Sequence, residues 1–340
     1  MAETAEPVLE VKGLKTVFRT RGGEIHAVND VSFHLHPGEL LGVVGESGSG
    51  KSVTMMSLLR LLPTPPAEIR KGTALLKGKD MLAMSDAELR GVRGARVGFI
   101  FQDPMTSLNP VFTLGNQVME PLIKHKAMSK AQAEARAVEL LELVGIPDAR
   151  RRLYQYPHQF SGGMRQRVMI AIALACDPDL LIADEPTTAL DVTIQAQILE
   201  LVKELRRKLG MAIIWITHDL GVIAGIADRV MVMYGGQVVE QAPVKDLFAN
   251  PQHPYTRALL QTIPRITGER SERLKVIEGQ PPILTAALTA CPFRARCEHR
   301  HDACDASNPA RRAVDGRAVG EGHDVACHWR APAAAEMAHA

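Results

Sequence analysis

The sequence has 340 residues, of which 46% are hydrophobic and 23% charged, as in an ordinary globular protein. This composition excludes a mainly disordered or fibrous chain. Lys and Arg number 40 against 38 Asp and Glu, so the formal charge of +2 lacks the basic excess typical of nucleic-acid-binding proteins. Any phosphate chemistry must therefore come from a local site.

The apolar segments of the chain are short. The first residues carry no basic segment followed by an apolar run, so we expect no secretory signal there. The longest apolar run, Val168 to Cys176, is far shorter than the ~20 residues that a membrane-spanning helix needs. We expect a soluble, cytoplasmic protein that reaches a membrane only through a partner.

Segments with the periodicity of strands recur along the first 240 residues. The first two alternate apolar and polar residues, which predicts one solvent-exposed face, and the central ones are apolar, which predicts buried parallel strands. The last two flank Gly235-Gly236 and predict a hairpin. The predicted strands are 9–12, 31–36, 40–44, 97–101, 180–183, 212–216, 230–234 and 237–240.

Predicted helices lie between these strands. Ser161 and Asp191 precede two of them and are residue types that commonly cap helix N-termini. The predicted helices are 52–62, 129–144, 162–175 and 191–210, and a helical segment, 114–144, is inserted in the core. The alternation of strands and helices to about residue 228 predicts an α/β fold with a mostly parallel sheet. From about residue 250, Pro, Arg, His and Cys increase, which predicts a small, loop-rich extension.

The segment from Gly45 to Ser52 fits the phosphate-loop pattern G-x-x-x-x-G-K-[ST] and lies between a predicted strand and a predicted helix. Its glycines let backbone N–H groups surround phosphate oxygens, and the helix N-terminus favours an anion. Lys51 is expected to reach the β and γ phosphates and Ser52 to bind Mg²⁺. The alternative is a Gly/Ser-rich turn with a chance lysine. The nucleotide residues predicted here are Gly45, Ser47, Gly48, Gly50, Lys51 and Ser52.

Two carboxylates end the predicted strand 180–183. Asp184 in this position can hold Mg²⁺ through water, and Glu185 can polarise an attacking water as general base. The alternative is a solvated acidic pair at the start of a loop.

The segment Phe160-Ser161-Gly162-Gly163-Met164-Arg165-Gln166 resembles the signature motif of ATP-binding-cassette (ABC) ATPases. Other elements of that family stand in the same order: Gln102 as the Q-loop glutamine, Ala189-Leu190-Asp191 as the D-loop and His218 as the switch histidine. Phe18 matches the aromatic residue that stacks on adenine, although a half-buried strand residue is an equal alternative and His26 is nearby. The resemblance covers about residues 8–245, with Phe160 where Leu is commoner and Met164 where Gln is commoner.

This resemblance implies a P-loop ABC-type nucleotide-binding domain over residues 1–249, with a helical insertion at about 114–175. It implies that Gln102 binds Mg²⁺ with Ser52 and Asp184, and that Gln102 and His218 assist Glu185 in hydrolysis. It also implies a second anion site, because Ser161, Gly162, Gly163 and Asp191 would contact ATP bound to another subunit. ATP would then hold two cassettes together and hydrolysis would release them.

The segment Asn250-Pro251-Gln252-His253-Pro254-Tyr255-Thr256 resembles the extension, here 250–330, of cassettes that serve dipeptide and oligopeptide importers. The best match is the D-type ATP-binding subunit, which implies an ATPase that powers peptide uptake from the cytoplasmic face of the inner membrane. Implied partners are two permease subunits, a second ABC ATPase expected to be a different protein and an extracytoplasmic solute-binding protein, with no nucleic acid. Residues 331–340 are expected to be a flexible tail.

Four of the five cysteines crowd into the last sixth of the chain: Cys291, Cys297, Cys304 and Cys327. The residues alone leave three interpretations open, namely a [4Fe–4S] cluster, a zinc site in which His299, His301 or His328 replaces a cysteine, and free or disulfide-bonded thiols. The subfamily resemblance favours a [4Fe–4S] cluster held by all four. Cys176 is expected to be a small buried hydrophobic residue.

Three other functions remain as alternatives. The importer could carry nickel, glutathione or another small solute, because no residue of a cassette touches the solute. A nucleic-acid or ribosome-linked cassette ATPase is disfavoured by the single phosphate loop and the absence of a heptad run. A binding or redox-sensing module with an inactive cassette is disfavoured by the intact Lys51, Asp184, Glu185 and His218.

Overall fold

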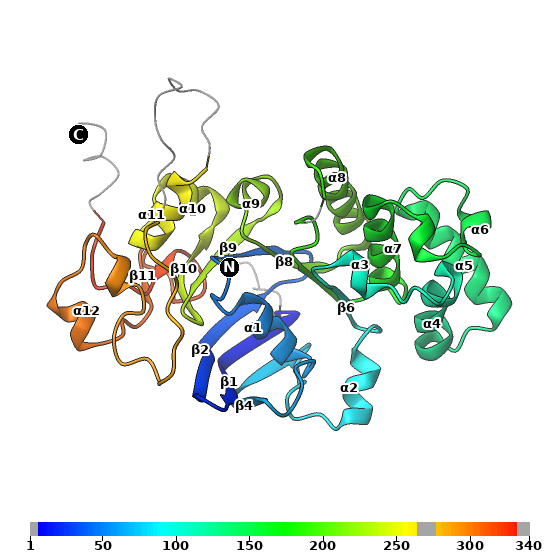
Figure 1. Cartoon of the computed structure of the whole chain (residues 1–340). Coiled ribbons are helices and arrows are strands. Elements are labelled where there is room, and N and C mark those ends of the chain that lie inside the picture. The colour runs from blue at the N-terminus through cyan, green and yellow to red at the C-terminus, as the bar shows by residue number, and fades with distance from the viewer. Residues whose placement is uncertain (1–5, 189, 264–276, 332–340) are drawn as a thin grey trace, which may run out of the picture. The chain divides into compact units, whose positions relative to one another are not determined.

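The computed structural model describes residues 6–188, 190–263 and 277–331, and the chain divides into two compact units. Unit 1 comprises the described residues of 1–8, 35–40 and 83–216, and unit 2 those of 9–34, 41–82 and 217–340. Among the helix and strand labels of Figure 1, those from α2 to β8 belong to unit 1 and the others to unit 2. From residue 332 on, the predicted flexible tail lies outside the described residues.

Three parallel strands run through unit 1. They are β6 (Val97–Ile100), β7 (Leu180–Asp184) and β8 (Ala212–Thr217), in the order β8-β7-β6. Ala183 of β7 is paired with Ile100 on one side and with Trp215 on the other. Every residue of β7 and β8 is buried, which explains why these strands are continuous apolar runs.

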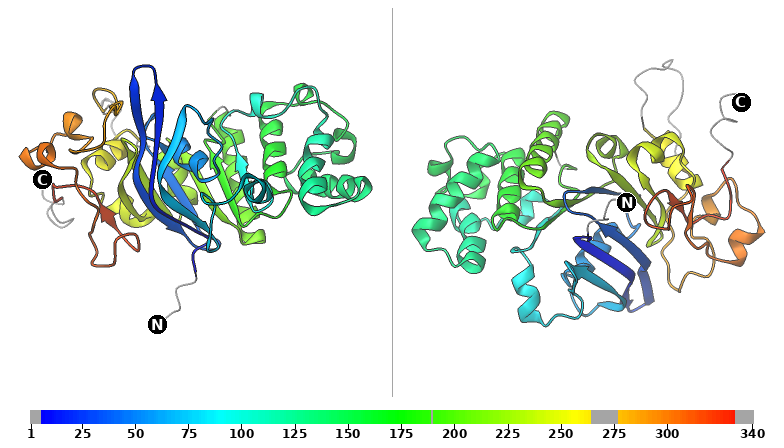
Figure 2. Two further views of the ribbon diagram at one scale, coloured as in Figure 1. Left: turned by 90° about the horizontal axis from the view of Figure 1, so that it is seen from below. Right: turned by 180° about the vertical axis from the view of Figure 1, so that it is seen from behind.

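Two helices of unit 1 begin where the sequence predicts caps. Ser161 Oγ accepts a hydrogen bond from the backbone of Met164 (3.4 Å), and Asp191 Oδ1 accepts one from that of Ile194 (2.9 Å). The helices α4, α5 and α7 pack against one another, as the green ribbons of Figure 2 show. The helices are α2 (Asp86–Val92), α3 (Pro104–Ser107), α4 (Leu114–Lys126), α5 (Lys130–Leu143), α6 (Ala149–Arg152), η1 (Pro157–Gln159), α7 (Gly162–Leu174) and α8 (Val192–Leu209).

Unit 2 contains an antiparallel sheet in the order β2-β1-β4-β5. Its first two strands form the long hairpin drawn in dark blue in Figure 2, and with 12 and 13 residues they extend well beyond the predicted 9–12 and 31–36. The sequence analysis missed β4, because its central Arg, Lys and Gly interrupt the apolar alternation and pairing with β1 holds it in place. The strands are β1 (Leu9–Thr20), β2 (Gly23–Leu35), β4 (Ala67–Leu76) and β5 (Lys79–Asp80).

A second group of strands in unit 2 joins distant parts of the chain, in the order β11-β12-β10-β9-β3. The predicted strand 40–44 is confirmed as β3, which pairs in parallel with β9. The predicted hairpin is confirmed as β9 and β10, and β12 pairs with β10, so that Glu240 lies opposite Val325. The strands are β3 (Leu40–Val44), β9 (Arg229–Tyr234), β10 (Gln237–Pro243), β11 (Arg312–Ala313) and β12 (Asp324–Val325).

The first helix of unit 2 is shorter than predicted. The prediction of a helix to about Leu62, ended by Pro63, is wrong, since α1 ends at Leu58. Arg60 adopts a positive φ of 48°, and the backbone N–H of Leu61 donates to Met56 O, so a tight turn closes the helix before the prolines. The helices are α1 (Lys51–Leu58), α9 (Leu220–Ile226), α10 (Val244–Ala249), α11 (Pro254–Gln261), η2 (Arg294–Arg296) and α12 (Asp302–Ala306).

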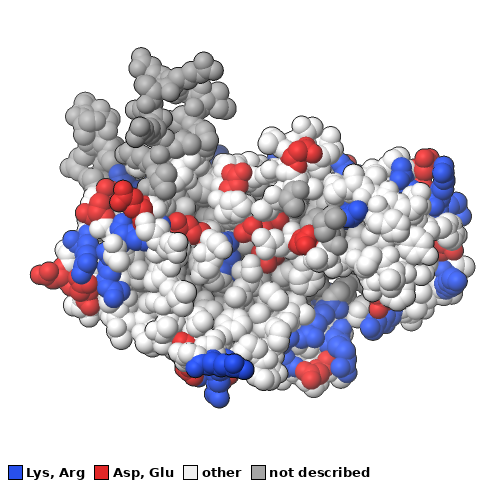
Figure 3. Space-filling model, in the orientation of Figure 1, with Lys and Arg blue, Asp and Glu red and all other residues white. Residues whose placement is uncertain are grey.

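The surface carries charges of both signs. Figure 3 shows Lys and Arg side chains interspersed with Asp and Glu side chains over the visible face. This agrees with the near balance of 40 basic and 38 acidic residues in the sequence. Within the described part of the chain, none of the helices combines the length and the apolar character needed to cross a membrane.

Candidate functional site

The phosphate loop of unit 2 follows β3 and is shaped by close backbone contacts. Gly45 and Gly50 have φ values of 151° and 97°, which side-chain-bearing residues rarely adopt. A Cβ atom at Gly45 would lie 2.3 Å from Met233 O, and one at Gly50 would lie 2.6 Å from Ala27 O. The backbone oxygen of Ser49 accepts a hydrogen bond from Gly236 N (3.0 Å). These positions therefore require glycine, and the protein's own backbone sets the shape of the loop.

Lys51 lies over this loop. It is the first residue of α1, its side chain is buried, and its Nζ atom donates to Gly45 O (2.7 Å) and Glu46 O (3.0 Å). The ammonium group is thus directed at the loop, as the motif requires of a phosphate-binding lysine. Ser52 follows at the start of the helix and is half-buried.

Glu46, inside the loop, is contacted by two residues from beyond residue 249. Its backbone N–H donates to Tyr255 Oη (2.8 Å), and its carboxylate accepts from Arg296 Nη1 (2.6 Å) and Nη2 (3.0 Å). Sequence reasoning missed all three as site residues. Tyr255 lies in a motif that the sequence analysis singled out and Arg296 precedes Cys297, but no local pattern reports a pairing across 250 positions.

In unit 1, Glu185 and Gln102 are in contact. Glu185 directly follows β7 and has a φ of 45°, a strained backbone conformation for a residue with a side chain. Its Oε2 atom accepts hydrogen bonds from Gln102 Nε2 (3.2 Å) and Thr188 Oγ1 (3.1 Å). Asp184 is the buried last residue of β7. Strain of this kind is common at functional sites, and here it directs a carboxylate toward the predicted Q-loop residue.

The signature segment of unit 1 packs against the start of α8. A Cβ atom at Gly163 would lie 2.7 Å from Ile194 Cγ2, so only glycine allows this approach without a shift. A Cβ atom at Gly162 would lie 3.7 Å from Leu190 Cδ2. The signature segment and the described part of the predicted D-loop are therefore neighbours, while Ala189 lies outside the described residues.

The predicted nucleotide and magnesium residues are distributed over both units. Phe18 is half-buried in β1 opposite Ala67 of β4, and His218 is exposed just after β8. The predicted residues in unit 1 are Gln102, Ser161, Gly162, Gly163, Asp184, Glu185 and Asp191. Those in unit 2 are Phe18, Gly45, Ser47, Gly48, Gly50, Lys51, Ser52 and His218.

The four C-terminal cysteines all lie in unit 2. Cys291, Cys304 and Cys327 are buried, Cys297 is half-buried, and Cys291 N donates to Cys304 O (3.0 Å). Burial, together with the charges that the other three thiolates would carry, raises the pKa of the Cys327 thiol to about 12. The four thiols are therefore close enough to interact electrostatically. In the described residues, no three or more His, Cys, Asp or Glu side chains are arranged to hold a single metal ion.

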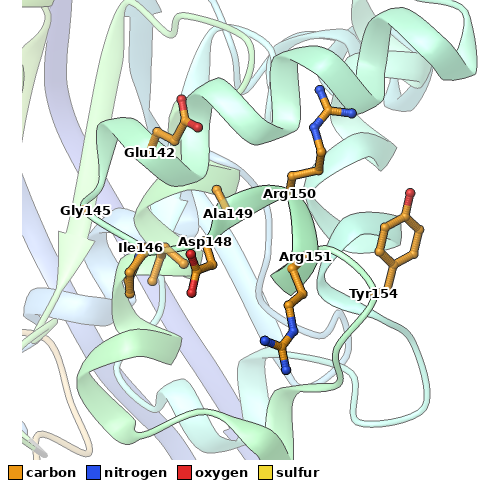
Figure 4. Close-up of a pocket in the computed structure, with 9 residues that line it drawn as sticks. Glu142, Gly145, Ile146, Asp148, Ala149, Arg150, Arg151 and Tyr154 are labelled. Atoms are coloured by element: carbon orange, nitrogen blue, oxygen red, sulfur yellow. The ribbon is translucent and has the colours of Figure 1, made fainter.

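Two further features lie in unit 1. Cys176 is buried, as expected of a small hydrophobic residue, with its Sγ atom 3.5 Å from Pro121 O. A surface pocket of about 870 Å³ lies between the ends of α5 and α6, with Arg150 and Arg151 at its rim (Figure 4). None of the predicted site residues lines this pocket.

Comparison with known families and proteins gives concordant results. The "ABC transporter" family matches residues 28–188, and the "Oligopeptide/dipeptide transporter, C-terminal region" family matches residues 239–304. The dipeptide transport ATP-binding protein DppD of Bacillus subtilis is 53% identical over 334 residues, which cover 98% of this chain and 97% of DppD. The oligopeptide transport ATP-binding protein OppD of Salmonella typhimurium is 50% identical over 315 residues, 93% of each chain.

Solved structures show the same fold. The ATP-binding cassette MJ0796, bound to ADP and phosphate as a dimer, matches with a TM-score of 0.62 and 30% identity, over 69% of this chain and 98% of that one. Clostridium perfringens cbiO1, part of an ABC transporter complex, matches with a TM-score of 0.62 and 28% identity, over 72% of this chain and 92% of that one. The chain therefore belongs to the ABC transporter ATPases, in the group that carries the oligopeptide/dipeptide transporter C-terminal region.

Proposed function

We propose that this chain is the ATP-hydrolysing subunit of an importer that powers the uptake of dipeptides or oligopeptides across the cytoplasmic membrane. The observation that carries this proposal is the oligopeptide/dipeptide transporter match at residues 239–304, next to an ABC transporter match at 28–188. In this proposal residues 1–249 form the ATPase domain, with its helical insertion at about 114–175, and residues 250–330 form the extension.

The chemistry is ATP hydrolysis with Mg²⁺. Lys51 and the loop backbone would bind the phosphates, and Ser52, Gln102 and Asp184 would supply the oxygen ligands that Mg²⁺ prefers. The Ser52 hydroxyl at the start of α1 and the buried Asp184 carboxylate at the end of β7 fit this role. Mg²⁺ would neutralise charge on the phosphates. Glu185 takes the proton of the attacking water as it adds to the γ-phosphate, with Gln102 and His218 assisting, and ADP leaves.

A second cassette, which we propose is a different protein, completes each site. Ser161 caps the 13-residue helix α7, which begins with Gly162 and Gly163, and such an N-terminus favours an anion. Together with Asp191 they would contact ATP bound by the partner cassette, while Phe18 would stack on adenine in this one. ATP binding then joins the two cassettes and hydrolysis separates them.

The permease subunits would bind the helical region 114–144 and the Gln102 loop. Hydrogen bonds from the backbone N–H of Leu114 to Gln155 O (2.9 Å) and from that of Gly115 to Leu153 O (2.7 Å) hold the start of α4, and so the segment that leads into it, beside the segment 153–156. Large apolar side chains are exposed on both segments, including Phe112 (51%) and Tyr154 (64%). Such a surface suits an apolar helix of a permease. The subunit would thus be peripheral, on the cytoplasmic face of the inner membrane, in a system with an extracytoplasmic solute-binding protein.

We also propose that Cys291, Cys297, Cys304 and Cys327 hold a [4Fe–4S] cluster. The four thiols all lie in the extension, three of them buried and one half-buried, and a [4Fe–4S] cluster takes four thiolate ligands. The cluster would link segments of the extension and would not carry electrons for the ATPase.

Anaerobic purification tests the cluster. The proposal expects brown protein with absorption near ~400 nm and about four irons per chain. Colourless protein with about one zinc and no iron would leave the four-cysteine site but replace its occupant.

An uptake assay tests the transport function. Cells that lack this chain should fail to take up a labelled dipeptide, and the wild-type chain should restore uptake, whereas Glu185→Gln should not. Restored uptake of nickel or glutathione, with no effect on peptides, would instead favour the alternative solutes.

A further inference from the structure

We propose that Arg296 and Tyr255, both from the C-terminal extension, are positioning residues of the phosphate loop and set its affinity for nucleotide. They do so by holding Glu46, a variable position of the motif. This inference rests on the proposed ATP site. It gives the extension a second role, because residues more than 200 positions from the phosphate loop hold part of that loop in place.

Arg296 is bound on all sides. Its guanidinium donates two hydrogen bonds to the Glu46 carboxylate, one to Tyr234 Oη (3.2 Å) and two to the backbone oxygens of Ile277 (3.1 Å) and Glu278 (2.8 Å). Its side chain is only 6% exposed, whereas that of Glu46 is 25% exposed, so the guanidinium end of the ion pair is the one shielded from solvent. A two-bond arginine–carboxylate pair fixes direction as well as distance. Arg296 thus anchors the Glu46 side chain to the extension.

Tyr255 fixes the backbone of the same residue. Its hydroxyl accepts the Glu46 N–H (2.8 Å), and its ring is fully buried against Tyr234 and Phe293, with centroids 4.6 and 5.3 Å away. At the start of α11, the ring nitrogen Nδ1 of His253 accepts the Tyr255 N–H (3.0 Å). The hydroxyl therefore sits on a rigid platform, and the peptide between Gly45 and Glu46 cannot rotate without losing this bond.

Each polar group of Glu46 is held by a partner. Its N–H donates to Tyr255, its carboxylate accepts from Arg296, and its backbone oxygen accepts from Lys51 Nζ (3.0 Å) and from the backbone N–H of Ser49 (3.2 Å). The residue that orients the phosphate-binding lysine is thus itself oriented by the extension. Removing either anchor frees the peptide groups of Gly45 and Glu46, whose oxygens accept hydrogen bonds from Lys51. Nucleotide binding is then weakened equally in the ground state and in the transition state. Such uniform loss raises KM and leaves kcat nearly unchanged.

The test uses the intact chain, purified with its transporter complex. It compares variants of Arg296, Tyr255 and Arg300 by their MgATP hydrolysis and by their binding of ATP and ADP. Arg296→Met should raise the KM for ATP roughly tenfold, the loss expected when one net charge-assisted hydrogen-bond contribution disappears. Arg296→Lys should restore part of the affinity, because it keeps the charge but not the two-bond geometry. Tyr255→Phe, which keeps the buried ring, should raise KM by a smaller factor, with kcat within about twofold.

Arg300→Met is the matched control. Arg300 lies four residues on and also makes two hydrogen bonds to one carboxylate, that of Asp305 (2.9 Å each). Its replacement should leave KM unchanged. The double variant Glu46→Gln/Arg296→Met should raise KM no further than Arg296→Met alone, since both act through one pair.

Two outcomes would overturn the proposal. One is a wild-type KM in both Arg296→Met and Tyr255→Phe, whether or not their melting temperatures fall, and the other is an equal rise of KM in Arg300→Met. The Lys51→Ala variant distinguishes a failure of this inference from a failure of the proposed ATP site. If Lys51→Ala binds ATP like the wild type, the site itself is misassigned, whatever the Arg296 variants do.

Discussion

The phosphate loop of unit 2 and the Glu185–Gln102 group of unit 1 are held in different ways. The loop is fixed by buried backbone contacts: two glycines allow approaches that no Cβ permits, and Lys51 lies buried against loop carbonyls. The Glu185–Gln102 group depends on side-chain hydrogen bonds of 3.1 and 3.2 Å at an exposed edge, on a strained backbone. The first region is rigid, and the second can be rearranged at low energetic cost.

This difference separates two tasks. A loop whose shape is fixed by its own backbone contacts binds phosphate without reorganisation, so its residues should govern affinity. Exposed hydrogen bonds contribute little net free energy. Glu185 and Gln102 can therefore exchange their mutual contact for contacts to water and Mg²⁺, and they should govern turnover. Changes in the loop should alter KM, and changes in the Glu185–Gln102 group should alter kcat.

The largest expected effect is that of Glu185→Gln. Loss of the proposed general base should slow kcat by roughly 10²–10⁴-fold while nucleotide binding remains intact. Single-turnover hydrolysis and ATP binding measure the two quantities. Glu204→Gln, on an exposed position of α8, is the control. Unchanged hydrolysis by Glu185→Gln would show that another residue is the base.

Lys51→Ala comes next. It removes the buried ammonium group that is proposed to contact both the β and γ phosphates, so two charge-assisted contributions should be lost and ATP affinity should fall by about 10²-fold. Equilibrium binding of ATP measures it. Lys12→Ala, an exposed lysine of β1 that pairs with Glu10, should bind like the wild type. A fall in kcat with unchanged ATP affinity would contradict the proposal that the phosphate loop governs affinity and the Glu185–Gln102 group governs turnover.

Gln102→Ala should have a smaller effect. It removes one hydrogen bond to Glu185 and one proposed Mg²⁺ ligand, which should lower kcat by about tenfold and leave ATP affinity within a factor of about three. Gln197→Ala on α8 is the control. Steady-state kinetics with varied Mg²⁺ provide the measurement. A rise in KM with unchanged kcat would contradict the assignment of turnover to Gln102 and Glu185.

The smallest effect concerns stability. Burial lowers the pKa of His253 to about 4, against an ordinary value of about 6.5, and its neutral ring caps α11 through Tyr255 N. The unfolded chain therefore takes up this proton first, so stability should fall as pH decreases, by about 1 kcal/mol between pH 6.5 and 5.5. Denaturant titration at the two pH values measures this loss. His253→Asn should reduce the pH dependence, and the exposed His158→Asn should leave it unchanged.

Many local features were predictable from the sequence. The strand at 40–44 and the caps Ser161 and Asp191 follow from patterns of neighbouring residues, and the structure confirms them. The end of α1 was not predictable, because the positive φ of Arg60 ends it before any proline. The strand β4 was also not predicted, because its sequence lacks a regular apolar alternation and its pairing with β1 stabilises it as a strand.

By itself, the sequence determined the family, the phosphate-loop glycines and the order of the signature residues, because each depends on residue types at short spacing. Only the tertiary structure decided that Glu185 accepts a hydrogen bond from Gln102 and that Arg296 and Tyr255 hold Glu46. These pairs lie 83, 250 and 209 positions apart. Contacts over such separations are set by how sheets and loops pack, and local periodicity carries no record of them.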